Sequence, residues 1–273
     1  SGRDLFLNMQ ENNRSREYRC AVQESCHRYV REACQRNRGQ DLVVDKTVER
    51  HYVNMPDSDG EKILQLTADL NSAYGVTPDQ LGEKAGDLLS ITASSKARHE
   101  ALVKIITSIL KEEPETKIIV FANASYGGYD SAKAALDDAF KNRYANVDDS
   151  SSVERQNEVI AWFRHKDVTS EERERDKRIL LLSYEQAAGH NLQEACHNVI
   201  MFEPMYSGSD AVADASIEEQ AIGRVMRQGQ EHDVTVSRIL VKGPSGEDCV
   251  DNWVTDRNED EEVLKAATSN FDD

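Results

Sequence analysis

The sequence lacks the segments and motifs that mark several large classes of protein. It has no run of about twenty apolar residues, and we therefore expect no membrane-spanning helix. It also has no Gly-x-x-x-x-Gly-Lys-Ser/Thr phosphate loop and no strand that ends in Asp-Glu-x-His. Those two motifs hold nucleotide phosphates and Mg²⁺ in many ATPases. The chain alone is therefore not expected to hydrolyse a nucleotide.

Cysteine is scarce, and its spacing does not suit a metal site. The five cysteines are Cys20, Cys26, Cys34, Cys196 and Cys249. None of them forms a Cys-x-x-Cys pair, which is the usual arrangement of zinc ligands in small domains. The adjacent pair Cys26-His27 does not supply that spacing, so we predict no metal site and reduced thiols of an intracellular protein.

The chain is strongly acidic, with a formal net charge of -17. Sequence-independent binding to nucleic acid depends on phosphate contacts by Lys and Arg, so an acidic chain is not expected to bind DNA tightly alone. A small patch of loop amides and a few cations is still compatible with binding. Part of the acidity lies in residues 256–273, which we predict to be a solvated tail.

Apolar runs of strand length alternate with polar loops and helical patterns over most of the chain. The runs lie at residues 117–121, 178–183, 198–202 and 234–241. A helix is expected from Ser94-Ser95, because caps there precede an apolar face that ends before Pro114. This order of elements is typical of an α/β fold with an open, mainly parallel sheet flanked by helices.

The pattern divides the chain into three stretches. Residues 1–88 are polar and helix-leaning, interrupted by a strand-like run from Thr47 to Val53. Residues 89–255 hold the sheet pattern, and the acidic tail follows. Ligands of open parallel sheets lie beyond the carboxyl ends of the strands, where we place Asn123, Ser183 and the loop at Gly189.

Two arginines near residue 225 are the strongest indication of a binding site. The pattern predicts a helix that ends in Gly229 and presents Gln220, Arg224 and Arg227 along one strip, because spacings of three and four residues share a helical face. Two adjacent guanidinium groups suit a polyphosphate better than a single carboxylate. The simpler alternative is a solvated helix with scattered arginines.

These motifs, taken in order, resemble the second RecA-like lobe of Swi/Snf-type ATPases, which belong to the superfamily 2 helicases. Motif IV of the family is matched by Lys117–Asn123, motif V by Ser183, Gly189-x-Asn191-Leu192 and Glu194-Ala195, and motif VI by Gln220-Ala221-x-x-Arg224-x-x-Arg227-x-Gly229-Gln230. Residues 150–163, with Arg155-Gln156 and Trp162-Phe163, resemble the segment that follows the first strand and helix of that lobe. The stretch Glu194-Ala195 with His197 is also similar to the branch that contains RING-bearing ubiquitin-ligase translocases.

The resemblance implies a role for each matched residue. Arg227 would be the arginine finger, and Arg224 would reach the same nucleotide phosphates. Gln220, Gly189 and Asn191 would bind the nucleotide. Ser183, Asn123 and Ser151 would touch the phosphates of the tracked DNA strand. Residues 1–88 would be the segment between the lobes, with its helical protrusions.

The resemblance also implies an activity for the whole protein. The chain would be the C-terminal lobe of an ATP-dependent translocase on double-stranded DNA or nucleosomes, acting in the nucleus in chromatin remodelling or DNA repair. ATP and Mg²⁺ would be bound mainly by the N-terminal RecA-like lobe of the same protein. Two alternatives remain open: a degenerate lobe that serves as a scaffold or partner-binding module, and an RNA helicase lobe.

Three features depart from the family pattern and favour the degenerate alternative. Gln186 stands where motif V usually has its first glycine, and Asp148 stands where a glycine usually precedes the Ser/Thr-rich turn. The connection at residues 205–216 is longer than usual and rich in small polar residues. We expect it to form an exposed loop.

Overall fold

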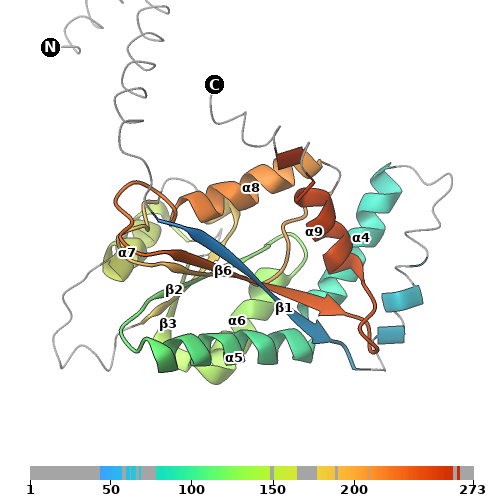
Figure 1. The fold of residues 1–273 in the computed structure, drawn as a ribbon, viewed down its shortest axis with the longest axis horizontal. Helices are drawn as coiled ribbons and strands as arrows, with labels where there is room; N and C mark the ends of the chain where they lie inside the picture. Colours follow the sequence, from blue (N-terminus) through green and yellow to red (C-terminus); the bar gives the residue numbers. More distant parts are fainter. Residues whose placement is uncertain are drawn as a thin grey trace, which may run out of the picture. The chain divides into compact units, whose positions relative to one another are not determined.

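The fold is given by a computed structural model (Figure 1). It describes residues 44–56, 60, 61, 63–65, 68, 78–147, 151–164, 177–187, 190–208, 210–260, 263 and 264. The residues from Val44 onward form one compact unit. Predictions for the first 43 residues, for Asp148 and for Gly189 lie outside the described residues.

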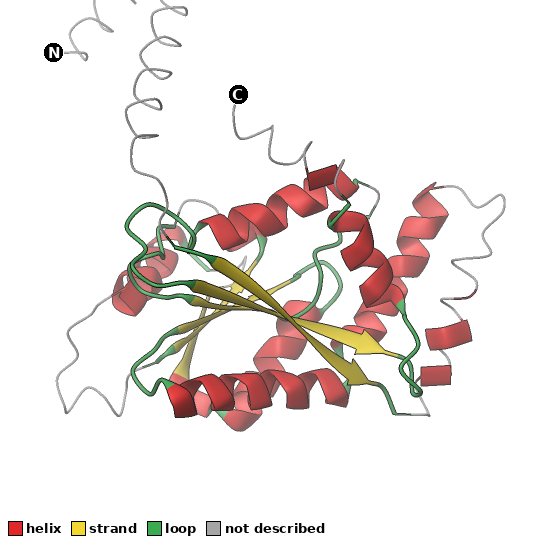
Figure 2. Ribbon diagram, in the orientation of Figure 1, coloured by secondary structure: helices red, strands yellow, loops and turns green. Residues whose placement is uncertain are grey.

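Six parallel strands form a single sheet. They are β1 (Lys46–Asn54), β2 (Ile118–Ala122), β3 (Tyr144–Val147), β4 (Ile179–Ser183), β5 (Asn198–Met201) and β6 (Val234–Lys242). Their order across the sheet is β1-β6-β5-β2-β4-β3, and every neighbouring pair is parallel. Figure 2 shows the strands as the central layer, with helices on both sides. The predicted α/β fold is confirmed.

Helices cover both faces of the sheet, which explains why the central strands are continuous apolar runs. The helices are α4 (Pro78–Ala93), α5 (Lys96–Glu112), α6 (Gly128–Ala139), α7 (Val153–Arg164), α8 (Ala211–Gly223) and α9 (Val250–Asn258), with short 3₁₀ turns at Lys141–Arg143 (η1) and Glu185–Ala187 (η3). Helices α5 and α6 pack on one face, and α7 and α8 pack on the other. Every residue of β2, β4 and β5 is buried as a result. Within the described part of the chain, no helix has the length and apolar character that crossing a membrane requires.

The helix predicted after Ser94-Ser95 is confirmed as α5. Ser95 is its N-cap, and the Ser95 hydroxyl accepts a hydrogen bond from the Arg98 backbone N–H at 3.3 Å. The predicted apolar face packs inward, with Leu102 and Ile106 fully buried. Helix α5 ends at Glu112, two residues before Pro114.

The boundary predicted at residue 88 differs from the structure, because β1 belongs to the sheet. Strand β1 pairs with β6 along its whole length, from Lys46 opposite Val234 to Asn54 opposite Lys242. It is an edge strand, and its mostly exposed residues explain why its apolar signal is weak. The unit that contains the lobe therefore begins at Val44, well before the predicted boundary.

The boundary predicted at residue 256 also differs from the structure. Helix α9 continues to Asn258, whose side-chain amide donates to the Met205 carbonyl at 2.8 Å. Glu259 forms ion pairs with Arg50 of β1 and Arg238 of β6. The first residues of the predicted tail are therefore part of the folded unit.

Candidate functional site

The prediction that one helix carries Arg224 and Arg227 is wrong, because α8 ends at Gly223. The Arg224 carbonyl, which a longer helix would offer to the N–H four residues later, instead accepts the Leu192 N–H at 3.0 Å. Beyond it the chain runs through turns to Gly229, which has a positive φ of 95°. Of the three residues, Gln220 alone lies on the helix, where it is half-buried.

The turn after α8 nevertheless brings together three of the residues predicted to meet the nucleotide. The Arg227 guanidinium donates a hydrogen bond to the Asn191 side-chain oxygen at 2.6 Å. The backbone bond between Leu192 and Arg224 fixes the same loop against the turn. Arg227 is exposed, while Arg224 is half-buried. The loop after β4 therefore positions the guanidinium of Arg227 and the backbone of Arg224.

The charges of the two arginines are not neutralised within the described part of the chain. The Arg227 guanidinium binds the neutral amide of Asn191, and the buried Nε of Arg224 has no hydrogen-bond partner there. Burial, and then the positive charge of Arg227, lowers the pKa of Arg224. Burial, followed by the charge of Arg224, likewise lowers the pKa of His190. An anion with several oxygens would relieve this repulsion, because guanidinium groups bind phosphate with paired hydrogen bonds.

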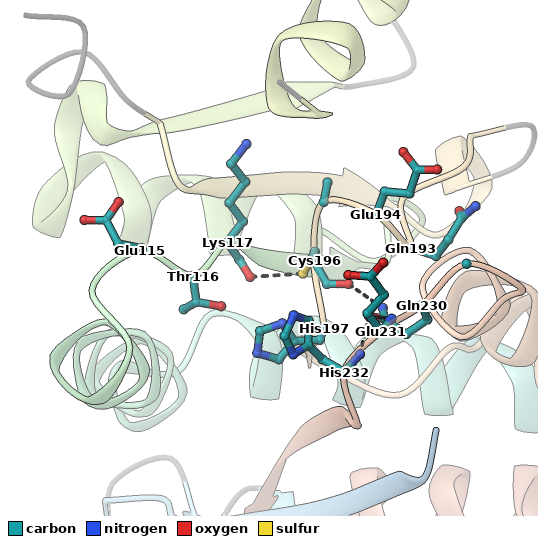
Figure 3. A pocket seen from close by; sticks show the side chains of 12 residues that line it. Glu115, Thr116, Lys117, Gln193, Glu194, Cys196, His197, Gln230, Glu231 and His232 are labelled. Atoms are coloured by element: carbon teal, nitrogen blue, oxygen red, sulfur yellow. Dashed lines mark hydrogen bonds between the residues drawn. The ribbon is translucent and has the colours of Figure 1, made fainter. Parts of the chain in front are cut away.

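A polar pocket of about 240 Å³ lies beside the arginine turn (Figure 3). Its lining includes Lys117, His197 and His232, which lie just before β2, β5 and β6, so the pocket is at the amino edge of the sheet. The two imidazole rings are 4.9 Å apart between centroids, and His197 Nε2 lies 3.0 Å from a Glu113 oxygen. The lining thus combines Lys117 and the two imidazole rings with the carboxyl side chains of Glu115, Glu194 and Glu231.

Gln230 is a structural residue of this turn that the sequence motif contained without indicating its role. Its side-chain amide donates to the carbonyls of Cys196 at 2.9 Å and Val225 at 3.1 Å. Its side-chain oxygen accepts the backbone N–H groups of Glu231 and His232, both at 3.1 Å. The bond to Cys196 holds the arginine turn against the residues just before β5, and the other three bonds fix the shape of the turn.

The residues predicted to contact DNA lie at the opposite, carboxyl edge. Asn123 follows β2, Ser183 ends β4, and Ser151 follows β3. Because β2, β4 and β3 are neighbours in the sheet, the three residues belong to adjacent strand ends, as the parallel topology predicted. The structure therefore separates the predicted site into an arginine turn at one edge and a row of strand ends at the other.

Asn123 and Ser183 are more deeply buried than direct DNA contacts would suggest. They are 2% and 1% exposed, respectively. The Asn123 amide donates to the Tyr206 carbonyl at 2.8 Å, and its side-chain oxygen accepts the Ser125 N–H at 2.8 Å. The Ser183 hydroxyl accepts the Gln186 N–H at 3.3 Å. Their side chains therefore shape the loops at this edge, and their contact with DNA remains a prediction.

The connection at residues 205–216 is exposed at Ser207 and Asp210, as its composition predicted, but its other described residues are buried or half-buried. Met205 and Tyr206 are each 1% exposed, and residues from Ala211 onward already belong to α8. Asp210 caps that helix by accepting two backbone N–H groups at 3.0 Å. Buried Asp214 accepts the Ser207 N–H at 3.0 Å. Hydrogen bonds made by Asp210 and Asp214, which composition does not reveal, therefore fix Ser207 and the start of α8.

The described residues offer guanidinium groups that suit nucleotide phosphates but no cluster of Mg²⁺ ligands. Among the described residues, no three His, Cys, Asp or Glu side chains are grouped so that they could hold a metal ion. Burial raises the pKa of the Cys196 thiol to about 12, and Cys249 behaves in the same way. Both thiols are free and buried. Arg224 and Arg227 are the groups of this lobe that could bind a triphosphate.

The parallel sheet, with an arginine turn at one edge and polar strand ends at the other, defines the class as a RecA-like α/β lobe. Residues 98–229 match the family model of the helicase conserved C-terminal domain. These residues thus carry a helicase C-terminal domain, and the fold is similar to that of solved Swi/Snf-type ATPase structures. The predicted helicase C-terminal lobe is confirmed for this segment, whereas membership of the Swi/Snf family and of its RING-bearing branch stays a prediction.

Three solved structures have a similar fold. The C-terminal part of the Fun30 ATPase domain is 14% identical with a TM-score of 0.57, over 83% of this chain and 95% of that one. The Sulfolobus solfataricus SWI2/SNF2 ATPase core in complex with double-stranded DNA is 16% identical with a TM-score of 0.53, and the match covers 82% of this chain and 50% of that one. The Sulfolobus solfataricus SWI2/SNF2 ATPase core domain is 17% identical with a TM-score of 0.53, and the match covers 74% of this chain and 41% of that one. The chain therefore spans half or less of the length of the Sulfolobus cores.

Proposed function

We propose that this chain is the C-terminal lobe of an ATP-dependent translocase on double-stranded DNA, and that it supplies the arginine finger of a site shared with an N-terminal lobe. The observation that carries the proposal is the turn after α8, where Arg227 binds the neutral Asn191 side chain and the buried Nε of Arg224 has no hydrogen-bond partner among the described residues. Paired guanidinium groups stabilise the charge that develops on a phosphoryl group during transfer.

Each group of this turn would have a distinct task. Arg227 is exposed and would reach the terminal phosphate of ATP bound on the other lobe, with Asn191 setting the direction of its guanidinium. Arg224 is half-buried and would bind the same phosphates from a fixed position. ATP and Mg²⁺ would supply the phosphoryl group and its charge compensation. Without its partner lobe, this lobe would not turn over ATP.

The row of strand ends at the carboxyl edge would contact the DNA along which the protein moves. The similar Sulfolobus core was solved in complex with double-stranded DNA, which supports this substrate. Helix α6 begins at this edge, and backbone N–H groups at a helix N-terminus attract phosphate. Loop amides of this kind would let an acidic chain contact DNA at a small patch. A task in chromatin remodelling or DNA repair in the nucleus is part of the same proposal.

The choice of nucleic acid gives the direct test. In the protein that contains both lobes, we expect double-stranded DNA to raise the rate of ATP hydrolysis at low salt by about tenfold or more, because backbone contacts favour the closed arrangement of the lobes. The measurement is steady-state phosphate release with double-stranded DNA, single-stranded DNA or double-stranded RNA. Stimulation by RNA alone would support an RNA helicase lobe, and hydrolysis that no nucleic acid stimulates would support a scaffold.

A further inference from the structure

A carboxyl group is buried beside the N-terminus of α6, at the carboxyl edge of the sheet, which we propose contacts DNA. Glu203 comes two residues after β5 and is 3% exposed. Its Oε1 accepts a hydrogen bond from the Asn123 backbone N–H, and its own backbone carbonyl accepts the Tyr184 hydroxyl at 2.7 Å. Glu203 therefore connects the ends of β2, β4 and β5 beneath the surface of this edge.

Gly128, the first residue of α6, makes the space that the carboxyl group occupies. A Cβ at Gly128 would lie 1.9 Å from Glu203 Oε1 and 2.7 Å from Oε2, and real carbon atoms do not approach so closely. Glu203 Oε2 is buried and has no hydrogen-bond partner in the described part of the chain. A buried polar atom without a partner is unusual and costly. The carboxyl group of Glu203 therefore occupies a buried position in which one of its two oxygens has no hydrogen bond among the described residues.

The neighbouring charges would compensate a negative charge on Glu203 only in part. Arg98 of α5 favours the charged form of Glu203, but its guanidinium pairs with Asp251 of α9 and donates to the Phe202 carbonyl at 2.6 Å. Asp251 and Glu185 of η3 both oppose a negative charge on Glu203. Tyr184 contributes its neutral hydroxyl, because burial raises its pKa well above the ordinary value. Burial, only partly offset by Arg98, raises the pKa of Glu203 to about 8.

We propose that Glu203 is a positioning residue of the DNA-contacting edge, and that its carboxyl group takes up a proton when a DNA phosphate binds at the N-terminus of α6. The proposal rests on the proposed function. It goes further by naming a buried residue and a proton as participants in DNA binding.

Competition between two anions at one helix end is the physical reason. The N-terminus of a helix favours negative charge, and here the Glu203 carboxylate approaches it from inside the lobe. A phosphate that arrives from solvent places a second negative charge nearby, and a like charge favours the neutral form of a carboxyl group. The neutral group still has an oxygen that accepts the Asn123 N–H. The loop after β2 can therefore keep its position while the repulsion is removed.

The direction of the pH dependence follows from this linkage. The pKa of Glu203 would be about 8 without DNA and higher with DNA, so the complex holds more protons than the free protein. Binding is then strongest below pH 8 and weakens as the pH rises through that value. One linked proton changes the dissociation constant by at most about tenfold for each pH unit.

The test is the affinity for a DNA duplex as a function of pH, measured by fluorescence anisotropy in the protein that contains both lobes, without nucleotide and at fixed salt. For the wild type we expect the Kd to rise by about three- to tenfold between about pH 7 and about pH 9. Glu203→Gln keeps the shape and cannot ionise, so its Kd should be nearly independent of pH over this range. The melting temperatures of both proteins, measured at both pH values, would reveal a merely structural effect.

Several outcomes are decisive. An equal rise of Kd in the wild type and in Glu203→Gln would overturn the role of this carboxyl group and leave the proposed function intact. A wild-type Kd that is independent of pH would do the same. Absence of DNA binding at every pH would overturn the proposed function, and the proton linkage with it.

A second variant tests the geometry independently of charge. Gly128→Ala places a methyl group where the carboxyl group lies, so we expect weaker DNA binding and loss of the pH dependence. Gly223→Ala is the matched control, because a Cβ there meets nothing within 4 Å and the residue ends α8 far from the loop after β2. DNA binding by Gly128→Ala with the affinity and pH dependence of Gly223→Ala would contradict the proposal, even if Glu203→Gln failed to fold.

Discussion

Replacement of Arg227 by alanine in the protein that contains both lobes is expected to lower DNA-stimulated ATP hydrolysis by about a thousandfold or more. The guanidinium is exposed, and within the described part of the chain its side-chain hydrogen bond goes to Asn191. Its loss should therefore change the free energy of unfolding of this lobe very little. The measurement is kcat at saturating ATP and DNA, together with the melting temperature of wild type and variant.

Two further variants test whether Arg227 acts as an arginine finger or only as a positive charge. Arg227→Lys keeps the charge without the paired donors of the guanidinium, so most of the activity should still be lost. Asn191→Ala keeps the finger but removes the acceptor at 2.6 Å, so a smaller loss of about tenfold is expected. An Arg227→Ala protein that retains wild-type kcat would refute the finger and favour a degenerate lobe.

The sequence predicted the fold well, because hydrophobic burial dictates most of it. The central strands are buried on both faces, and their unbroken apolar runs in 117–121, 178–183 and 198–202 follow from that burial. Edge strand β1 is exposed along most of its length, so its pattern is weak and the lobe boundary was placed too late. Periodicity reports burial and carries little information about the edge of a sheet.

The candidate site was predicted less completely, because its geometry depends on hydrogen bonds between residues that are distant in the sequence. Periodicity continues the helix past Arg224, whereas the Leu192 N–H takes the Arg224 carbonyl and Gln230 holds the following turn. Motif order still identified Arg227 and Asn191, which the structure brings into contact. Glu203 carried no motif signal. A carboxylate directly after a buried strand was the one indication in the sequence that it required a special environment.

The largest expected effect on stability comes from a buried ion pair between α5 and α9. Arg98 and Asp251 are both fully buried. Asp251 also accepts the Val241 N–H at 2.8 Å and the Thr92 hydroxyl at 3.0 Å. Removal of one partner leaves an uncompensated charge in the interior. Asp251→Ala should therefore lower the free energy of unfolding by about 3–5 kcal/mol.

The measurement is urea denaturation of the chain, with the exposed pair between Lys96 and Glu100 of α5 as the internal control. Those side chains are 83% and 68% exposed, so Glu100→Ala should cost about 0.5 kcal/mol or less. The double variant Arg98→Met with Asp251→Leu removes both charges and should recover part of the loss. Because Arg98 also binds the Phe202 carbonyl next to Glu203, the recovered protein should still show altered DNA affinity. A loss in Asp251→Ala as small as that in Glu100→Ala would show that the ion pair does not hold α5 and α9 to the sheet.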